Sequence, residues 1–299
     1  MKTKKLTLFF AVILMLVSCG KEHAHEFWDG EYGNKNVGYL AFQLVWDEYD
    51  DTLSVIDNVK ITVSGADGFL KEYDFSSPAD AADQLQQLPE GSYDLLVMVD
   101  MTDKDGYTVA ADKTDGGLPP TTASLKVPSS SPRQSWFGTT TARVADNEVT
   151  IAKFTLKRLL SMFTIVVNGV PDGVKITAQA AGVAQSVELT SARPSVESFD
   201  DVALGAFVGS GTLKMENFML MPTASVSDRM TITLTTTENG KSLVSTIDAP
   251  KMVSGRYYEL TINYAGVSPY LIISETDIND WQQDWITDGE ILNPGNSGN

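Results

Sequence analysis

Short apolar runs, rich in Val, Ile, Thr, Tyr and Phe, recur along most of the chain and are separated by turn residues. In many of them apolar and polar residues alternate, as in Lys60-Ile61-Thr62-Val63-Ser64 and Thr231-Ile232-Thr233-Leu234-Thr235. Alternation with a period of two places the apolar side chains on one face of a half-buried strand. The pattern predicts strands at 37–46, 59–64, 92–101, 123–127, 149–156, 162–167, 174–180, 186–190, 212–221, 230–237, 242–247, 257–264 and 270–274.

Turn sequences such as Asp105-Gly106, Asn168-Gly169 and Asn239-Gly240 separate these runs. Many short strands at this spacing, joined by turns of this kind, are typical of β-sandwiches. Outside the tail the pattern predicts one short helix, over residues 79–88, which Pro89 and Gly91 close. The predicted fold class is therefore all-β.

The organisation of the chain follows from the breaks in this pattern. Residues 19–36 are polar and lack apolar periodicity, so we interpret them as a flexible tether. A Pro/Ser/Thr-rich stretch at 118–133 is interpreted as a long surface loop, because strand-like sequence resumes at Val149 and continues through Arg158. We expect a domain boundary near Lys157-Arg158, with an N-terminal β-sandwich at 37–157 and a C-terminal β-sandwich with a Trp-containing tail at 158–299.

The N-terminus has the pattern of a secretion signal. Three lysines within residues 2–5 precede an apolar run, Leu6 to Val17, that is too short to span a bilayer. The run ends in Leu16-Val17-Ser18-Cys19, which resembles the lipobox of bacterial lipoproteins, where the cysteine is acylated and becomes the first residue. We interpret residues 1–18 as a lipoprotein signal peptide and Cys19 as the lipidation site. The protein is then expected at the outer membrane, lipid-anchored at the cell surface.

The chain is strongly acidic, with 39 Asp and Glu against 22 Lys and Arg and a formal net charge of −17. Cleavage before Cys19 removes three lysines and no acidic residue, which lowers the charge to −20. Such a charge opposes binding to the phosphates of nucleic acids and to anionic lipids. We therefore expect no nucleic-acid partner, and attachment to the membrane through lipid alone.

The residues that would carry nucleophilic catalysis are missing from the predicted folded part. The only histidines, His23 and His25, lie in the tether, and Cys19 is the single cysteine. This pattern excludes a Ser/His/Asp or Cys/His site on the sandwiches, so we expect no enzymatic activity and no cofactor. Glu22, His23, His25, Glu26 and Asp29 form a donor cluster, but a tether gives it no fixed geometry, and we predict no metal site.

Three acidic clusters leave a calcium loop or a glycosidase site open as alternatives. We interpret them as solvated loops, and the Asp105-Gly106 pair within one of them as a hairpin turn. The clusters are Asp47, Glu48, Asp50 and Asp51; Asp100, Asp103 and Asp105; and Asp277, Asp280, Asp284 and Asp288.

Tryptophans are the candidate ligand-stacking residues. Trp281 and Trp285 are spaced i and i+4, which allows them to stack on one helical turn and to close the second sandwich. The alternative is a platform for a sugar ring, and Trp46 and Trp136 present the same two interpretations.

Several of these features together resemble the Bacteroidetes fimbrillin and fimbrial-anchor lipoproteins, the subunits of type V pili. They are the lipobox, the predicted sandwiches, the strand entrance Leu88-Pro89-Glu90-Gly91-Ser92-Tyr93-Asp94-Leu95, and the junction Leu156-Lys157-Arg158-Leu159-Leu160-Ser161-Met162-Phe163-Thr164-Ile165-Val166-Val167. The resemblance implies two tandem transthyretin-like β-sandwich domains with Greek-key topology. It also implies a role in pilus assembly and cell adhesion, with other pilus subunits as partners through strand exchange.

In that family the shaft subunits are matured by a trypsin-like protease, which cuts after an arginine in an early loop. The cut removes the first strand and opens a groove for a strand of a neighbouring subunit. Here the first arginine after Cys19 is Arg133, deep within the first predicted domain. This departure favours an uncut, lipidated anchor or accessory subunit over a polymerising one.

A second function remains open, namely a surface glycan-binding lipoprotein of a polysaccharide-uptake system. A glycan binder exposes aromatic side chains on loops, whereas a pilus subunit presents a groove or a sheet edge. The positions of Trp46, Trp136, Trp281 and Trp285 in the fold discriminate between the two.

Overall fold

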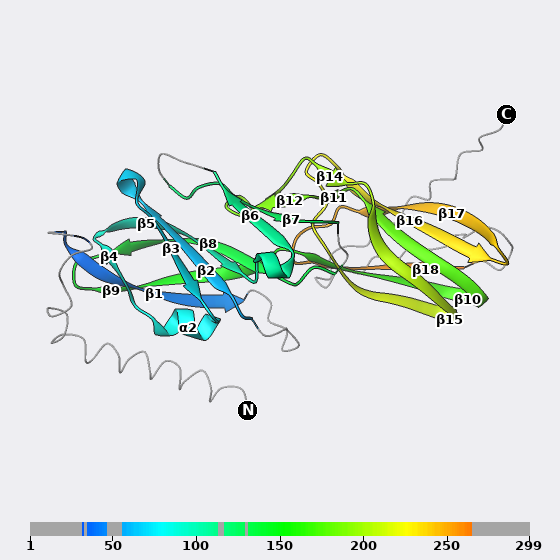
Figure 1. Cartoon of the computed structure of the whole chain (residues 1–299), viewed down its shortest axis with the longest axis horizontal. Coiled ribbons are helices and arrows are strands. Elements are labelled where there is room, and N and C mark those ends of the chain that lie inside the picture. Colours follow the sequence, from blue (N-terminus) through cyan, green and yellow to red (C-terminus); the bar gives the residue numbers. More distant parts are fainter. Residues whose placement is uncertain (1–31, 33–34, 47–55, 113–116, 129–130, 265–299) are drawn as a thin grey trace, which may run out of the picture.

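The structure is a computed structural model that describes residues 32, 35–46, 56–112, 117–128 and 131–264. These residues form an elongated, almost entirely β molecule in which two sandwich-like bodies lie end to end (Figure 1). The all-β prediction is confirmed. Within the described part of the chain, no helix has the length and apolarity needed to cross a membrane.

The first sandwich is built from a seven-stranded sheet with the order β3-β2-β5-β8-β9-β1-β4. Strands β8 and β9 are paired only at Trp136↔Arg158 and Phe137↔Lys157, so the sheet divides there into two layers. Its strands are β1 (Val37–Trp46), β2 (Val59–Gly65), β3 (Leu70–Phe75), β4 (Gln86–Pro89), β5 (Gly91–Val99), β8 (Trp136–Val144) and β9 (Val149–Arg158).

The apolar core of the first sandwich lies between these layers. Phe42 of β1 is 2% exposed, and its ring contacts the rings of Phe75 and Phe154 at centroid distances of 5.9 and 6.3 Å. Leu95 and Val97 of β5 face the same core and are completely buried. The alternation recognised in the sequence therefore places one face of each strand inside, as the period of two requires.

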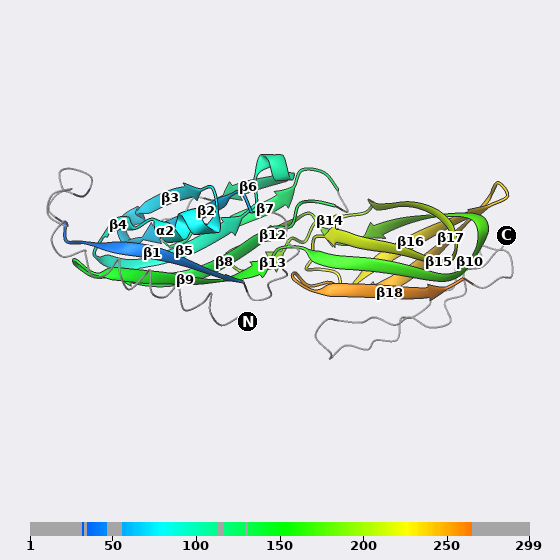
Figure 2. The same cartoon turned by 90° about the horizontal axis from the view of Figure 1, so that it is seen from below.

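The second sandwich is built around two long strands, β10 (Ser161–Ala181) and β15 (Val202–Leu220). The register of β10 with β15 shifts between Val167 and Val174, where Gly169 and Gly173 adopt left-handed backbone conformations. Figure 2 shows β10 turning back at this end of the molecule, so that its two halves contribute to opposite layers. Strands β16 (Arg229–Glu238) and β17 (Lys241–Pro250) continue one layer, and β18 (Tyr257–Asn263) pairs in parallel with the first half of β10.

A four-stranded sheet with the order β13-β12-β7-β6 joins the two sandwiches. Strands β6 (Tyr107–Ala111) and β7 (Thr121–Leu125) precede the expected boundary, whereas β12 (Ser186–Glu188) and β13 (Arg193–Pro194) follow it. Residues of β5, β6 and β7 also belong to the same buried apolar cluster as the core of the second sandwich. The remaining elements are the strand pair β11 (Val183–Ala184) and β14 (Ser198–Phe199), and the 3-10 turns η1 (Ala66–Gly68) and η2 (Asp103–Asp105).

Three sequence expectations need correction. The helix predicted at 79–88 is shorter, because α2 (Pro78–Asp83) ends where β4 begins to pair with β1. The stretch at 118–133, interpreted as a long surface loop, is not a loop throughout, because it contains β7, close to the strand predicted at 123–127. Strand β8 was not predicted, because apolar and polar residues alternate only weakly in its sequence. Its pairing with β5 makes it a strand, so strand structure resumes at Trp136 rather than at Val149.

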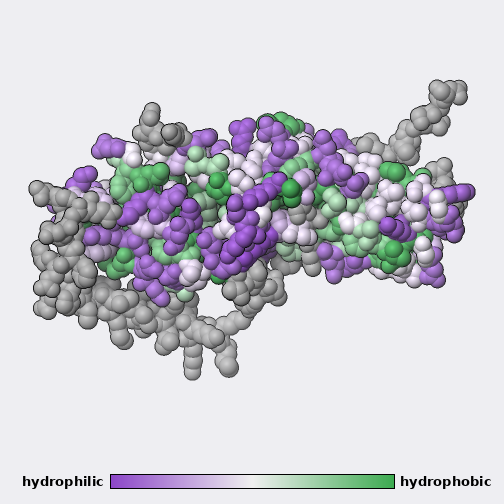
Figure 3. All heavy atoms as spheres, viewed as in Figure 1, coloured by the Kyte–Doolittle hydropathy of each residue, from purple (hydrophilic) through white to green (hydrophobic). Residues whose placement is uncertain are grey.

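The surface is mixed in character. On the face shown in Figure 3 hydrophilic residues predominate, and hydrophobic residues are interspersed among them in small patches. On such a mixed surface, the exposed edges of the sheets are the places at which a further strand can add.

Candidate functional site

The first strand, β1, lies inside the first sheet with a neighbour on each side. It pairs in parallel with β9 at eight positions, from Tyr39↔Val149 to Trp46↔Leu156. On its other side it pairs antiparallel with β4 at four positions, from Val37↔Pro89 to Leu40↔Gln86. The β9 side of β1 is therefore paired from Tyr39 to the end of the strand, whereas on the other side its first four residues have a described partner strand.

Side chains and the adjoining turn also hold β1 in place. Leu40 is completely buried, and the aromatic contacts of Phe42 connect β1 with β3 and β9. At the start of the strand, the backbone N–H of Asn147 donates to the carbonyl of Val37 at 2.8 Å. Removing β1 would expose one edge of β9 and an apolar strip of the core, which is the kind of groove that accepts a strand.

Other strands have a described neighbour on one side only. They include β3 and β4 in the first sheet, β15, β17 and β18 in the second, and β6 and β13 at the ends of the sheet that joins the sandwiches. Charged side chains lie along β3, where Lys60 on the neighbouring β2 pairs with Glu72 at 3.0 Å. Charges at an edge disfavour addition of a further strand.

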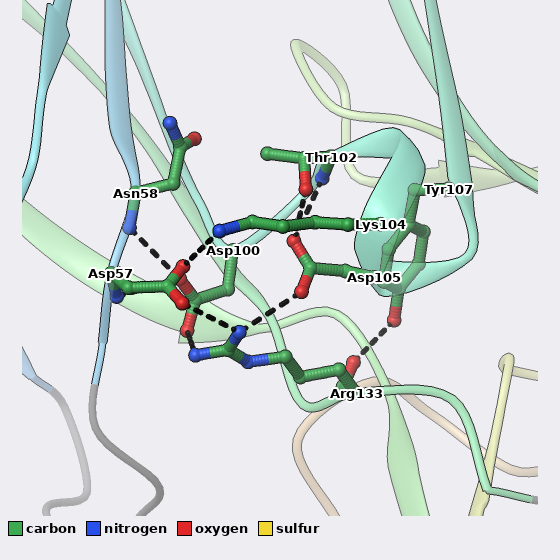
Figure 4. Close-up of polar contacts among 8 residues, drawn as sticks. All are labelled: Asp57, Asn58, Asp100, Thr102, Lys104, Asp105, Tyr107 and Arg133. Atoms are coloured by element: carbon green, nitrogen blue, oxygen red, sulfur yellow. Dashed lines mark hydrogen bonds and ion pairs between the residues drawn. The ribbon is translucent and has the colours of Figure 1, made fainter.

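Arg133, the first arginine after Cys19, is held by three carboxylates that come from distant parts of the chain (Figure 4). Its Nη1 donates to Asp57 at 3.2 Å and to Asp105 at 3.0 Å, and its Nη2 lies 3.0 Å from an oxygen of Asp100. The hydroxyl of Tyr107 donates to the backbone carbonyl of Arg133 at 2.7 Å. Only 25% of the arginine side chain is exposed.

This arrangement also explains the acidic cluster around Asp100. Asp105 accepts hydrogen bonds from the backbone N–H and the hydroxyl of Thr102, which forms a capping box for the turn η2. The carboxylate of Asp57 accepts hydrogen bonds from Lys104 and Arg133, which together hold its pKa below the usual value. The carboxylates are thus engaged by cations and by the turn, and the described residues contain no group of three or more His, Cys, Asp or Glu side chains that could hold a metal ion.

The structure separates the tryptophans singled out in the sequence. Trp136 is completely buried at the start of β8, so neither face of its indole is available to a sugar. Trp46 ends β1 and is partly buried against the same core. Cys19, Trp281 and Trp285 lie outside the described residues, as do the acidic clusters at 47–51 and 277–288.

The Arg133 network was not foreseen from the sequence. Asp57 and Arg133 are separated by 76 positions, and no local pattern marks them as partners. The one available sequence signal is the excess of acidic over basic residues, because a partly buried arginine in such a chain is expected to pair with carboxylates.

Comparisons with known proteins agree with this architecture. A family model described as "Fimbrillin-A associated anchor proteins Mfa1 and Mfa2" matches residues 39–287. None of the curated proteins matches the sequence.

Among solved structures, the fimbrial anchor protein Mfa2 from Porphyromonas gingivalis is similar, with 13% identity and a TM-score of 0.56 over 86% of this chain and 100% of that one. A candidate adhesin from Bacteroides thetaiotaomicron shows 10% identity and a TM-score of 0.55, over 88% of this chain and 100% of that one. A candidate polysaccharide-binding protein from the same organism shows 12% identity and a TM-score of 0.54, over 87% and 99%.

At these identities the similar structures show a shared fold. The family model goes further, because it matches most of the sequence. The chain belongs to the family of fimbrillin-A associated anchor proteins Mfa1 and Mfa2.

Proposed function

We propose that this chain is a lipid-anchored subunit that retains its first strand and attaches a fimbrium to the outer membrane. Membership of the anchor family associates it with fimbriae, and a similar structure carries the name of a fimbrial anchor protein. The observation that carries the proposal is the position of β1, which pairs with β9 from Tyr39 to Trp46 and with β4 from Val37 to Leu40.

A retained β1 blocks one route of polymerisation. While β1 pairs with β9 and fills the core between the layers, a strand of a neighbouring subunit has no place to insert there. Strand exchange would then use a single interface, at an edge of the second sheet, where β15, β17 and β18 each have one described neighbour. Each backbone hydrogen bond gained there contributes on the order of 1 kcal/mol, and the burial of alternate side chains in pockets adds to the attachment.

The surroundings of Arg133 support retention of β1. A trypsin-like protease must bind an arginine side chain in its own pocket, and the guanidinium of Arg133 is engaged by Asp57, Asp100 and Asp105. The two residues after it, Gln134 and Ser135, are 9% and 0% exposed. Cleavage at this position requires the surrounding structure to open first.

Lipidation at Cys19 is the second part of the proposal, and it rests on the lipobox-like sequence. Acylated, the cysteine would hold the protein at the outer membrane with the folded body outside. Detergent-phase partitioning and the intact mass of the mature protein test it. We expect the protein in the detergent phase with an acylated Cys19, and a soluble or uncleaved product for Cys19→Ala. An unmodified Cys19 in the mature protein contradicts the proposal.

The glycan-binding alternative receives less support from the described tryptophans. Stacking on a sugar needs an open indole face, and Trp136 has none. The similar candidate polysaccharide-binding protein shares the fold, at 12% identity.

A further inference from the structure

A cavity of about 490 Å³ lies where the two sandwiches meet. Trp136, Phe137 and Leu156 of the first sandwich line it on one side, and Met252 and Val253 of the segment before β18 line it on another. A volume of this size is in the range of pockets that hold organic ligands, so it can receive a large side chain.

The charged residues that line this cavity are all basic. They are Lys157, Arg158, Lys251 and Arg256, with no Asp or Glu among the described residues of the lining. This concentration is unusual in a chain with a net charge of −17. Four cations around an apolar cavity favour an occupant that is both apolar and acidic.

We propose that this cavity is the docking site of the chain's own acidic segment, residues 275–290, with Trp281 seated among the apolar side chains. Residues 265–299 contain six acidic residues and no lysine or arginine, which complements the basic lining. The acidic positions, Glu275, Asp277, Asp280, Asp284, Asp288 and Glu290, flank both Trp281 and Trp285.

The path of the chain makes this docking reachable. Strand β18 begins directly after Arg256, which lines the cavity, and runs to the far end of the second sandwich (Figure 2). Its seven residues span roughly 23 Å at about 3.3 Å per residue. The sixteen residues from Ala265 to Asp280 can extend over roughly 50 Å, which exceeds the return distance. The family match also continues to residue 287, so residues 275–287 of this segment belong to the part of the chain that the family model covers.

Disulfide trapping in the full chain tests the proposal. Cys19 is the only cysteine, so Cys19→Ser provides a cysteine-free background. Into it we would introduce Ser254→Cys at the cavity together with Asp280→Cys, and compare Ser254→Cys with Ser297→Cys, which lies beyond the acidic segment. Docking raises the effective concentration of position 280 at the cavity, so its intramolecular disulfide should form at least about tenfold faster than the control.

Charge variants test whether the basic lining attracts the acidic segment. Lys157→Glu with Lys251→Glu should lower the rate of disulfide formation at position 280 to that of the control pair. The exposed pair Lys153→Glu and Lys175→Glu carries the same charge change away from the cavity and should leave that rate unchanged. Far-UV circular dichroism verifies folding, and Lys157→Gln with Lys251→Gln replaces the first pair if it fails to fold. The proposal would be overturned if disulfides formed at equal rates at positions 280 and 297, or if the charge reversal had no effect. Disulfides formed only between molecules would also overturn it, because they would assign the cavity to a second copy of the chain.

Discussion

The guanidinium Nη2 of Arg133 lies 3.0 Å from Oδ2 of Asp100, whose side chain is completely buried. The other oxygen of Asp100 accepts hydrogen bonds from the backbone N–H groups of Asp57 and Asn58, each at 3.1 Å. Burial raises the pKa of the Asp100 carboxyl, and the backbone hydrogen bonds and the charge of Arg133 oppose that shift. Asp100 therefore ties the segment that enters β2 to the segment that enters β8.

Replacing Asp100 by alanine should destabilise the fold and expose Arg133. The change leaves two backbone donors without their acceptor and takes away one of three carboxylates from the guanidinium, at a cost of about 2 kcal/mol. Denaturant unfolding measures the loss, and trypsin digestion followed by mass spectrometry measures cleavage after Arg133, which should be faster than in the wild type. Asp146→Ala, in an exposed turn, is the control. Unchanged stability with unchanged cleavage would show that the network does not protect Arg133.

Gly38 provides a test of how tightly β1 is held. A Cβ at this position would overlap the backbone oxygen of Ala145 and lie 2.8 Å from Cγ1 of Val144, so alanine forces β1 away from the adjoining turn. Overpacking of this kind costs about 1–3 kcal/mol. We expect Gly38→Ala to lower the unfolding free energy and to speed hydrogen exchange of the β1 amides. Gln43→Ala, at an exposed position of the same strand, is the control and should have little effect. Equal hydrogen-exchange rates of the β1 amides in both variants would show that β1 is not tightly packed against the adjoining turn.

Tyr107 predicts a dependence of stability on alkaline pH. Its ring is completely buried and its hydroxyl donates to Arg133, and burial raises its pKa. A pKa that is raised in the folded state means that the unfolded chain releases the proton first, so stability is retained below about pH 10 and is lost above it. The slope from one such group approaches about 1.4 kcal/mol per pH unit. Tyr107→Phe should therefore lose stability less steeply above about pH 10 than the wild type, while the control Tyr39→Phe should follow the wild type.

The domain boundary expected near Lys157-Arg158 remains a prediction, and fragments 37–157 and 159–299 test it. Each should show β-type circular dichroism and cooperative unfolding. Because β7 pairs with β12 across the boundary, and because both halves contribute to one apolar cluster, each fragment should unfold at a lower temperature than the whole chain. If neither fragment folds while the whole chain does, the boundary is misplaced or the halves depend on each other.

Many strand positions were predictable from sequence, although β3 and β8, which also bury one face in part, were missed. The run at 37–46 was expected as a strand because it is rich in β-branched and aromatic residues, and β1 has the same bounds. The runs at 162–167 and 174–180 were both recognised, but they are parts of the single strand β10, which bends at glycines that local patterns cannot place in space.

Features that depend on distant pairing were not predictable. Residues 86–88 were predicted as the end of a helix, yet pairing with β1 makes them part of the strand β4. The sheet that joins the sandwiches depends on β7 meeting β12, some sixty positions away in sequence. The cations at the cavity likewise come from two separate segments, so neither segment alone indicates a basic site.

We expect the mature protein to keep its first strand and to end a fimbrium rather than extend it. The measurement is to purify the protein from outer membranes, determine its N-terminus, and count its copies per fimbrium by quantitative mass spectrometry. The expected result is a start at Cys19 and about one copy per fimbrium, because β1 occupies the position that an incoming strand would need. A start between residues 37 and 133, or many copies along the fibre, would contradict it.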